Sequence, residues 1–165
     1  MKTATEKQDV TPEDGFDPDP LHSMTLGYLV NLIARLMAQA LKTRNGPDGI
    51  LPGQYPVALE LLMRDGMSQR DLCEAVRIEQ ATMANTLKRM ERDGLIVRRQ
   101  SAEDGRLSTI HLTPRGRKLT RAAVDNVAEI NRLALQGLDR HTQAELRDTL
   151  LALAERLEQD VCRRS

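Results

Sequence analysis

The sequence predicts a mainly α-helical protein that carries one small β-hairpin. Two observations support this fold class: aliphatic residues recur at helical spacing along most of the chain, and one stretch instead combines two short strand-like runs with a polar turn. The chain has 165 residues, which is enough for one compact domain with a core. Because aromatic residues make up only 2% and tryptophan is absent, the core must be aliphatic, with methionine.

The first 20 residues differ in composition from the rest of the chain. They contain three prolines and carry a net charge of −4, with almost no apolar residues. Too little apolar surface is present to offset the entropy of ordering, so we expect residues 1–20 to be disordered. A long helix is then predicted from residue 23 to about residue 44, with an apolar face too wide for an ordinary surface helix. The sequence NGPDG at residues 45–49 ends it.

The middle of the chain is predicted to hold three shorter helices. The first covers residues 55–64, and its expected inward residues are Leu59, Leu62 and Met63. The sequence SQRD at residues 68–71 has the spacing of a capping box and begins a second helix. After a tight turn near Arg77, the third helix covers residues 80–93 and ends at Gly94.

A β-hairpin and two further helices complete the predicted order. The strands cover residues 95–100 and 107–112. Thr113 before Pro114 favours a helix start there, and the apolar residues of that helix are Leu119, Ala123, Val127, Ile130 and Leu133. The sequence TQAE at residues 142–145 predicts a capping box that begins the last helix at Thr142. Its aliphatic residues in register are Leu146, Leu150, Leu153, Leu157 and Val161.

Charge is distributed unevenly along the chain. The formal net charge is zero, yet residues 78–118 carry a net charge of +4, and this local excess points to an anionic partner. No apolar run is long enough to span a membrane, and the first residues lack the apolar core of a signal peptide. The cysteines Cys73 and Cys162 form no paired motif, so a cytoplasmic location is expected.

The helix predicted at residues 80–93 has two faces of different character. Met83, Leu87 and Met90 share one face. The opposite face and its flanks comprise Ala81, Thr82, Asn85, Lys88, Arg89 and Arg92. A helix that reads DNA needs such a pattern, because small and amide side chains approach base edges while cations reach phosphates. A merely solvated helix face is the alternative interpretation, and Arg89 has a further one, pairing with nearby acids.

Arginines mark the predicted hairpin. Arg98 and Arg99 lie at the end of the first strand, and Arg106 lies at the start of the second. A two-stranded ribbon beside a recognition helix is a wing, and a wing arginine fits the narrow minor groove of DNA. Asp104 is placed to pair with Arg106 and fix its direction. In the alternative interpretation, Asp-Gly is favourable turn chemistry and Arg106 is solvated.

Residues 68–119 resemble the winged helix of the MarR (multiple antibiotic resistance regulator) family of transcription factors. The resemblance rests on MERDGLI at residues 90–96, DGR at residues 104–106 and LTPRG at residues 112–116, in order and at the family's spacing. PGQ at residues 52–54 also matches. The resemblance implies that Gln80, with the residues of the polar face, reads DNA and that Arg106 is the wing-tip arginine.

The resemblance further implies a homodimeric repressor that binds a palindromic operator in double-stranded DNA and responds to a small molecule. It divides the chain into an acidic segment at 1–20, an N-terminal dimerisation helix at 21–48, a winged helix-turn-helix DNA-binding domain at 49–113 and C-terminal dimerisation helices at 114–165. The alternative is a winged-helix protein-interaction module without DNA binding. The excess of cations on the recognition face favours DNA.

The family often binds aromatic or carboxylate compounds between its dimerisation helices and the winged helix. By that resemblance the candidate lining residues are Tyr28, Arg35, Met37, Tyr55 and Met63. A core position explains the methionines equally well. No other cofactor is expected.

Other chemistry has little support in the sequence. No phosphate loop or nucleophile elbow occurs, so we expect no enzyme, and the three histidines are too far apart to predict a metal site. Cys73 is interpreted as a small core residue. The redox-sensing branch of the family uses a cysteine in its N-terminal helix. Residues 1–72 contain none, so we do not expect peroxide sensing by that route.

Overall fold

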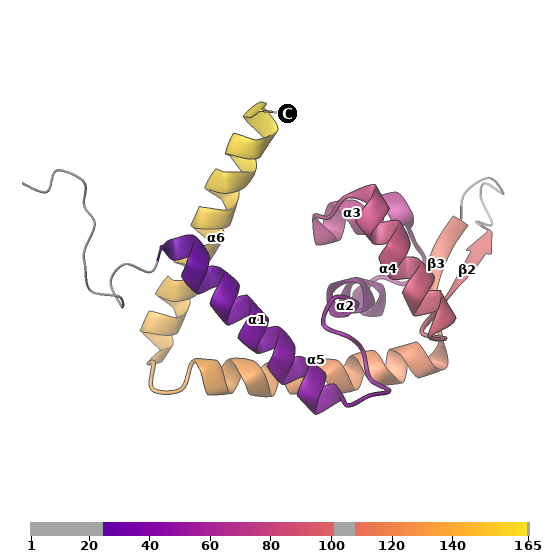
Figure 1. Cartoon of the computed structure of the whole chain (residues 1–165), viewed down its shortest axis with the longest axis horizontal. Helices are drawn as coiled ribbons and strands as arrows, with labels where there is room; N and C mark the ends of the chain where they lie inside the picture. Colours follow the sequence, from indigo (N-terminus) through magenta and orange to yellow (C-terminus); the bar gives the residue numbers. More distant parts are fainter. Residues whose placement is uncertain (1–24, 101–107, 165) are drawn as a thin grey trace, which may run out of the picture. The chain divides into compact units, whose positions relative to one another are not determined.

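A computed structural model describes residues 25–100 and 108–164 of the chain (Figure 1). Its elements are α1 (Leu26–Asn45), α2 (Tyr55–Met63), β1 (Met67–Ser68), α3 (Gln69–Val76), α4 (Gln80–Arg92), β2 (Ile96–Gln100), β3 (Ser108–Leu112), α5 (Pro114–Ala134) and α6 (Arg140–Arg164). This mainly helical order with one small sheet confirms the predicted fold class. The strand β1 is not among the predicted elements, because two residues are too few to show a strand pattern.

The described structure divides within α1 into two units. One unit extends to Met37 and the other begins at Ala38, so each is described by itself. The disorder expected for residues 1–20 lies outside the described residues, as do the wing positions Asp104 and Arg106.

The core of the second unit lies among α2, α3, α4, the sheet and α5. Its fully buried side chains include Val57, Ala58, Leu61, Leu72, Met83, Leu87, Met90 and Ile110. The core is aliphatic with methionine, as the scarcity of aromatic residues predicts. Because burying one Leu or Met side chain contributes about 1.5–3 kcal/mol, this cluster holds the helices and the sheet together.

The sheet is antiparallel with strand order β1-β3-β2. Met67 lies opposite Ile110, and Ile96 lies opposite Leu112. Residues directly opposite each other share a face, so these four buried side chains form the core face of the sheet.

The inner face of α2 differs from the prediction. Val57, Ala58 and Leu61 are buried, whereas Met63 is 67% exposed. The prediction that Met63 faces inward is therefore wrong, and Leu59 and Leu62 are only partly buried. The reason is helical geometry: residue 63 lies about 200° around the axis from residue 61, which points into the core.

The start of α6 also differs from the prediction. The helix begins at Arg140, and the carboxylate of Asp139 accepts a hydrogen bond from the backbone N–H of Thr142 at 2.8 Å. Asp139 therefore has the N-cap role, and the predicted start at Thr142 is wrong. Hydrogen bonds from the backbone and then the side chain of Thr142 lower the pKa of Asp139.

The junction between α4, β2 and α5 explains two of the sequence motifs. Thr113 caps α5 by accepting the N–H of Gly116 at 2.9 Å, and its hydroxyl donates to the Gly94 carbonyl at 2.8 Å. A Cβ at Gly116 would lie 2.0 Å from the carbonyl oxygen of Leu95, so this position requires glycine. Of the apolar residues expected along α5, Leu133 is exposed. Ile130 is the last buried residue of α5.

Two helices keep exposed apolar residues. On α1 these are Leu26, Leu29, Val30, Ile33 and Leu36. On α6 no residue is buried, and Leu150 and Leu157 are 47% and 67% exposed. Exposed apolar surface of this kind marks an interaction surface.

Candidate nucleic-acid interface

Helices α3 and α4, joined by a short turn, form a helix-turn-helix (Figure 1). The hydroxyl of Ser68 accepts the N–H of Asp71 at 3.1 Å, and the Asp71 carboxylate accepts the N–H of Ser68 at 3.3 Å. The predicted capping box is therefore confirmed. Hydrogen bonding to the side chain and then the backbone of Ser68 lowers the pKa of Asp71. Arg77 ends α3 in the left-handed region with φ 59° and ψ 48°, which turns the chain towards α4.

The two faces of α4 separate as the sequence predicts. Met83, Leu87 and Met90 are fully buried. The candidate DNA-binding residues Gln80, Ala81, Thr82, Asn85, Lys88, Arg89 and Arg92 are all exposed. The buried face anchors the helix, and the exposed face presents amides near its start and cations near its end.

The cations of α4 differ in their partners. Arg92 donates from Nε to the Asp93 carboxylate at 3.0 Å. Within the described part of the chain, neither Lys88 nor Arg89 has a carboxylate within ion-pair distance, so the alternative pairing of Arg89 with nearby acids is not seen there. No described residue therefore neutralises these two charges, and both can contact an anionic partner.

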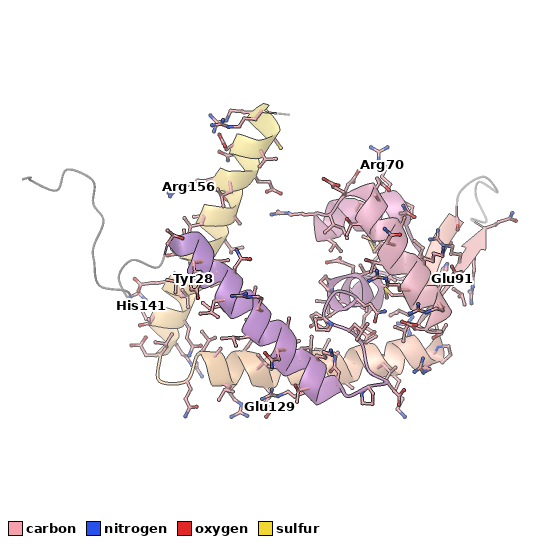
Figure 2. The ribbon with its side chains drawn as sticks, viewed as in Figure 1. Tyr28, Arg70, Glu91, Glu129, His141 and Arg156 are labelled. Atoms are coloured by element: carbon pink, nitrogen blue, oxygen red, sulfur yellow. The ribbon has the colours of Figure 1, made fainter. Side chains whose placement is uncertain are left out.

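The arginines of β2 point to opposite faces of the strand. Arg98 lies opposite Ile110, and Arg99 lies opposite Thr109. Arg98 is 3.6 Å from the carboxylate of Glu91, which lies near the end of α4 (Figure 2). Both arginines are exposed, but Arg98 connects the ribbon to α4, whereas Arg99 makes no ion pair with any described residue. Alternation along the strand separates the two roles.

A carboxylate at the base of the ribbon is a feature that sequence reasoning missed. Asp65 accepts the backbone N–H of Leu112 at 2.9 Å, and it lies 3.2 Å from Nδ1 of His111 and 3.3 Å from the Arg117 guanidinium. It therefore joins the turn after α2 to both β3 and α5. The sequence shows Asp65 only as a turn residue, because its partners are 46 or more positions away.

Gln54 gives the matched PGQ motif a structural role. The side chain is buried, and its oxygen accepts the N–H of Leu51 at 3.1 Å while its nitrogen donates to Asp93 at 3.1 Å. Arg115 donates to the backbone carbonyl of Asp93 as well. Burial acts to raise the pKa of Asp93, but hydrogen bonds from Arg92 and Gln54 outweigh it, so this pKa is lowered. The contacts fix the end of α4 against the start of α2.

The candidate effector residues lie in both units. Tyr28 (labelled in Figure 2), Arg35 and Met37 are on the part of α1 that belongs to the first unit. Tyr28 and Arg35 are exposed. In the second unit, Tyr55 packs against the core, and burial raises the pKa of its phenol. Tyr55 and Met63 are at opposite ends of α2, about 12 Å apart along its axis.

A cavity of about 730 Å³ lies between α5 and α6. It is lined by Asn131, Leu135, Arg140, Gln143, Ala144, Leu146, Arg147, Leu150 and Leu151. None of the candidate effector residues is among them. The cavity instead coincides with leucines of the exposed aliphatic row on α6.

Cys73 is buried, as expected for a small core residue. Burial, and then the neighbouring charge of Glu74, raises the pKa of its thiol, so little thiolate forms there at neutral pH. No helix in the described ranges is long and apolar enough to cross a membrane.

A capped α3, a left-handed turn, an amphipathic α4 and a two-stranded ribbon together define a winged helix-turn-helix protein, a class that binds DNA. A family model described as "MarR family" matches residues 48–107. The organic hydroperoxide resistance transcriptional regulator of Bacillus subtilis is 32% identical over 147 residues, covering 89% of this chain and 98% of that protein. The chain belongs to the MarR family of transcriptional regulators.

Solved structures agree with this assignment. The PcaV transcriptional regulator of Streptomyces coelicolor, in complex with its natural ligand, matches with a TM-score of 0.72 and 26% identity, over 81% of this chain and 94% of that one. The transcriptional repressor CouR, bound to a 23-mer DNA duplex, matches with a TM-score of 0.70 and 26% identity, over 82% and 96% of the two chains. These relatives are regulators rather than enzymes, as the sequence predicts.

Proposed function

We propose that this chain is a ligand-responsive repressor that binds a palindromic operator as a homodimer. The observation that carries the proposal is the division of α4, whose Met83, Leu87 and Met90 are buried while its amides and cations are exposed. In this proposal α4 enters the major groove. Gln80 and Asn85 contact base edges, and Lys88 and Arg89 contact phosphates.

The ribbon contributes a second contact in this proposal. Arg99 faces the phosphate backbone, and Arg106 reaches the minor groove, with Asp104 setting its direction. Arg106→Ala is expected to weaken duplex binding by about 1–3 kcal/mol without unfolding the protein, and Asp104→Ala to have a smaller effect. Fluorescence anisotropy with a labelled operator duplex measures this, and an unchanged affinity for Arg106→Ala rejects the wing contact.

A salt titration tests the proposal against its alternative, a protein-interaction module. The full chain is titrated into a labelled duplex of random sequence at increasing salt. For DNA binding, the logarithm of the affinity falls linearly with the logarithm of the salt concentration, because each phosphate contact releases counterions. Absence of duplex binding even at low salt would favour the alternative, a protein-interaction module that does not bind DNA.

The exposed rows on α1 and α6 support the homodimer. A second copy would cover Leu150, Leu157 and the leucines of α1 by a twofold axis, which is the commonest symmetry of soluble oligomers. This assigns residues 21–48 and 114–165 to dimerisation and residues 49–113 to DNA binding. The regulator is then cytoplasmic, where its operator lies.

The proposed effector is a small aromatic or carboxylate compound. The ligand complex of PcaV supports a ligand response, and the description of CouR as a repressor supports the sign of regulation. A thermal shift with a panel of benzoates tests the effector class. Although the Bacillus relative is a hydroperoxide regulator, residues 1–72 lack cysteine and Cys73 is buried. We therefore expect no hydroperoxide sensing through a cysteine of the N-terminal helix.

A further inference from the structure

A hydrogen bond between two glutamines joins the helices of the helix-turn-helix at its outer edge. Nε2 of Gln69 donates to Oε1 of Gln80 at 3.1 Å, and it lies 3.5 Å from the backbone oxygen of Gln80. Gln69 is the first residue of α3, and Gln80 is the first residue of α4. Gln80 is exposed and Gln69 is partly buried, so the pair lies at the border between the core and the proposed DNA surface.

This hydrogen bond fixes which end of the Gln80 amide faces outward. A glutamine side chain ends in two donors on nitrogen and one oxygen with two lone pairs. Gln69 occupies one lone pair of the Gln80 oxygen. The NH₂ group of Gln80 and the second lone pair of its oxygen remain available. A donor beside an acceptor is the combination that matches N7 and the N6 amino group of adenine in the major groove.

Gln69 is itself held in place at the start of α3. The capping box of Ser68 and Asp71 fixes the first turn of that helix, with hydrogen bonds of 3.1 and 3.3 Å. A single exposed glutamine has several rotatable bonds and would lose their freedom on binding a base. A partner on a fixed helix removes part of that loss before DNA arrives.

We propose that Gln69 is a positioning residue for base recognition, which holds the Gln80 amide in the orientation that reads adenine. The inference rests on the proposed function, since it requires α4 to lie in the major groove. Base recognition then depends on a residue of α3 as well as on the exposed face of α4.

The test is a selection of duplexes from a randomised library by the full-length chain and its variants. Gln80→Ala should relax the preference at one base pair in each half-site, with a loss of discrimination of roughly 5- to 150-fold. Gln69→Ala should relax the same base pair, and the double variant should add little to either single variant. Gln136→Ala, an exposed glutamine in the turn after α5, is the matched control and should leave the selected sequence unchanged.

Two further variants separate positioning from simple packing. Gln69→Lys keeps a donor towards the Gln80 oxygen, so it should retain the adenine preference. Gln69→Glu offers an acceptor instead. The Gln80 amide should then reverse, its oxygen should face the groove, and the preference should shift towards cytosine, whose N4 amino group donates. A bond that only tied α3 to α4 would change stability without changing the base preference.

The outcomes distinguish this inference from the proposed function. Relaxation of one shared base pair by Gln69→Ala and Gln80→Ala, restored by Gln69→Lys, supports positioning. A uniform loss of affinity at unchanged preference would assign Gln69 to phosphate contact alone and overturn the inference, while DNA binding would stand. The same holds if Gln80→Ala leaves every preference intact. If the wild-type chain retains no duplex at low salt, the proposed function fails and the inference fails with it.

Discussion

At the scale of single residues, adjacent positions on α4 have separate tasks. Met83 and Leu87 are fully buried and hold the helix in the core, whereas Asn85 and Lys88 on the other face are exposed. Substitution of an exposed residue without a partner in the core changes the folded state little. Effects of Asn85 and Lys88 variants on DNA binding can therefore be attributed to lost contacts with DNA rather than to a change in the fold.

The first prediction compares these two side chains. Lys88→Ala should weaken binding to all duplexes alike and reduce the salt dependence by about one unit, because one phosphate contact is lost. Asn85→Ala should instead change which base is preferred, because an amide pairs with base edges. Salt titration measures the first effect and duplex selection the second. An identical base preference for Asn85→Ala and the wild type would remove Asn85 from base recognition.

A second prediction concerns the cap of α3. Ser68→Ala removes the acceptor for the N–H of Asp71 and should lower the free energy of unfolding by about 0.5–2 kcal/mol. Urea unfolding followed by circular dichroism measures the change. Ser108→Ala, at an exposed position of β3, is the control and should have a smaller effect. Equal stabilities of Ser68→Ala and the wild type would contradict the cap.

The same cap predicts a dependence on pH. The pKa of Asp71 in the folded protein lies below its ordinary value of 3.8. Its ionised carboxylate therefore stabilises the fold fully above that value, and the contribution is lost as the pH falls through the lower folded pKa. Asp71→Asn should lack this part of the acid destabilisation. The unfolding free energies of the wild type and Asp71→Asn, each measured against pH, should converge as the pH falls below 3.8. A constant difference between the two curves at those pH values would argue against this role of Asp71.

At the scale of elements, α5 approaches the backbone of Leu95, the residue before β2, very closely. Gly116→Ala places a Cβ 2.0 Å from the Leu95 carbonyl oxygen, and this neighbour is backbone, which cannot move aside as a side chain could. We expect a loss of about 1–3 kcal/mol in the free energy of unfolding, or more, as for an overpacked core. Gly53→Ala meets nothing within 4 Å and is the control. Similar melting temperatures for the two variants would contradict the close approach.

The elements also show how far the sequence predicts the structure. The spacing of apolar residues predicts the helices α1 to α5, and cap motifs predict where α3 and α5 begin. Both signals are visible in the sequence because they involve residues that are close together along the chain. The sequence does not locate the start of α6, since Asp139 and Thr142 both offer cap chemistry and only the path of the chain selects one. The roles of Asp65 and Gln54 depend on partners 47 and 39 positions away, so no local pattern reveals them.

At the scale of the whole molecule, the exposed leucines of α6 predict a dimer. Leu157→Lys places a charge in the aliphatic row, and it should dissociate the dimer while the winged helix stays folded. Glu155→Lys introduces the same side chain on the opposite side of α6, about 160° away around the helix, and should leave the dimer intact. Light scattering at micromolar concentration distinguishes them. Monomeric wild-type protein that still binds its operator tightly would rule out the dimer.

The central claim is that two copies of α4, related by a twofold axis, read two half-sites of one operator. Hydroxyl-radical footprinting of the full-length protein on a duplex selected from a random library tests this directly. We expect two protected blocks in an inverted repeat, with half-site centres about 10 base pairs apart. A single asymmetric block, or no protection at concentrations that saturate the salt-dependent binding, would contradict it.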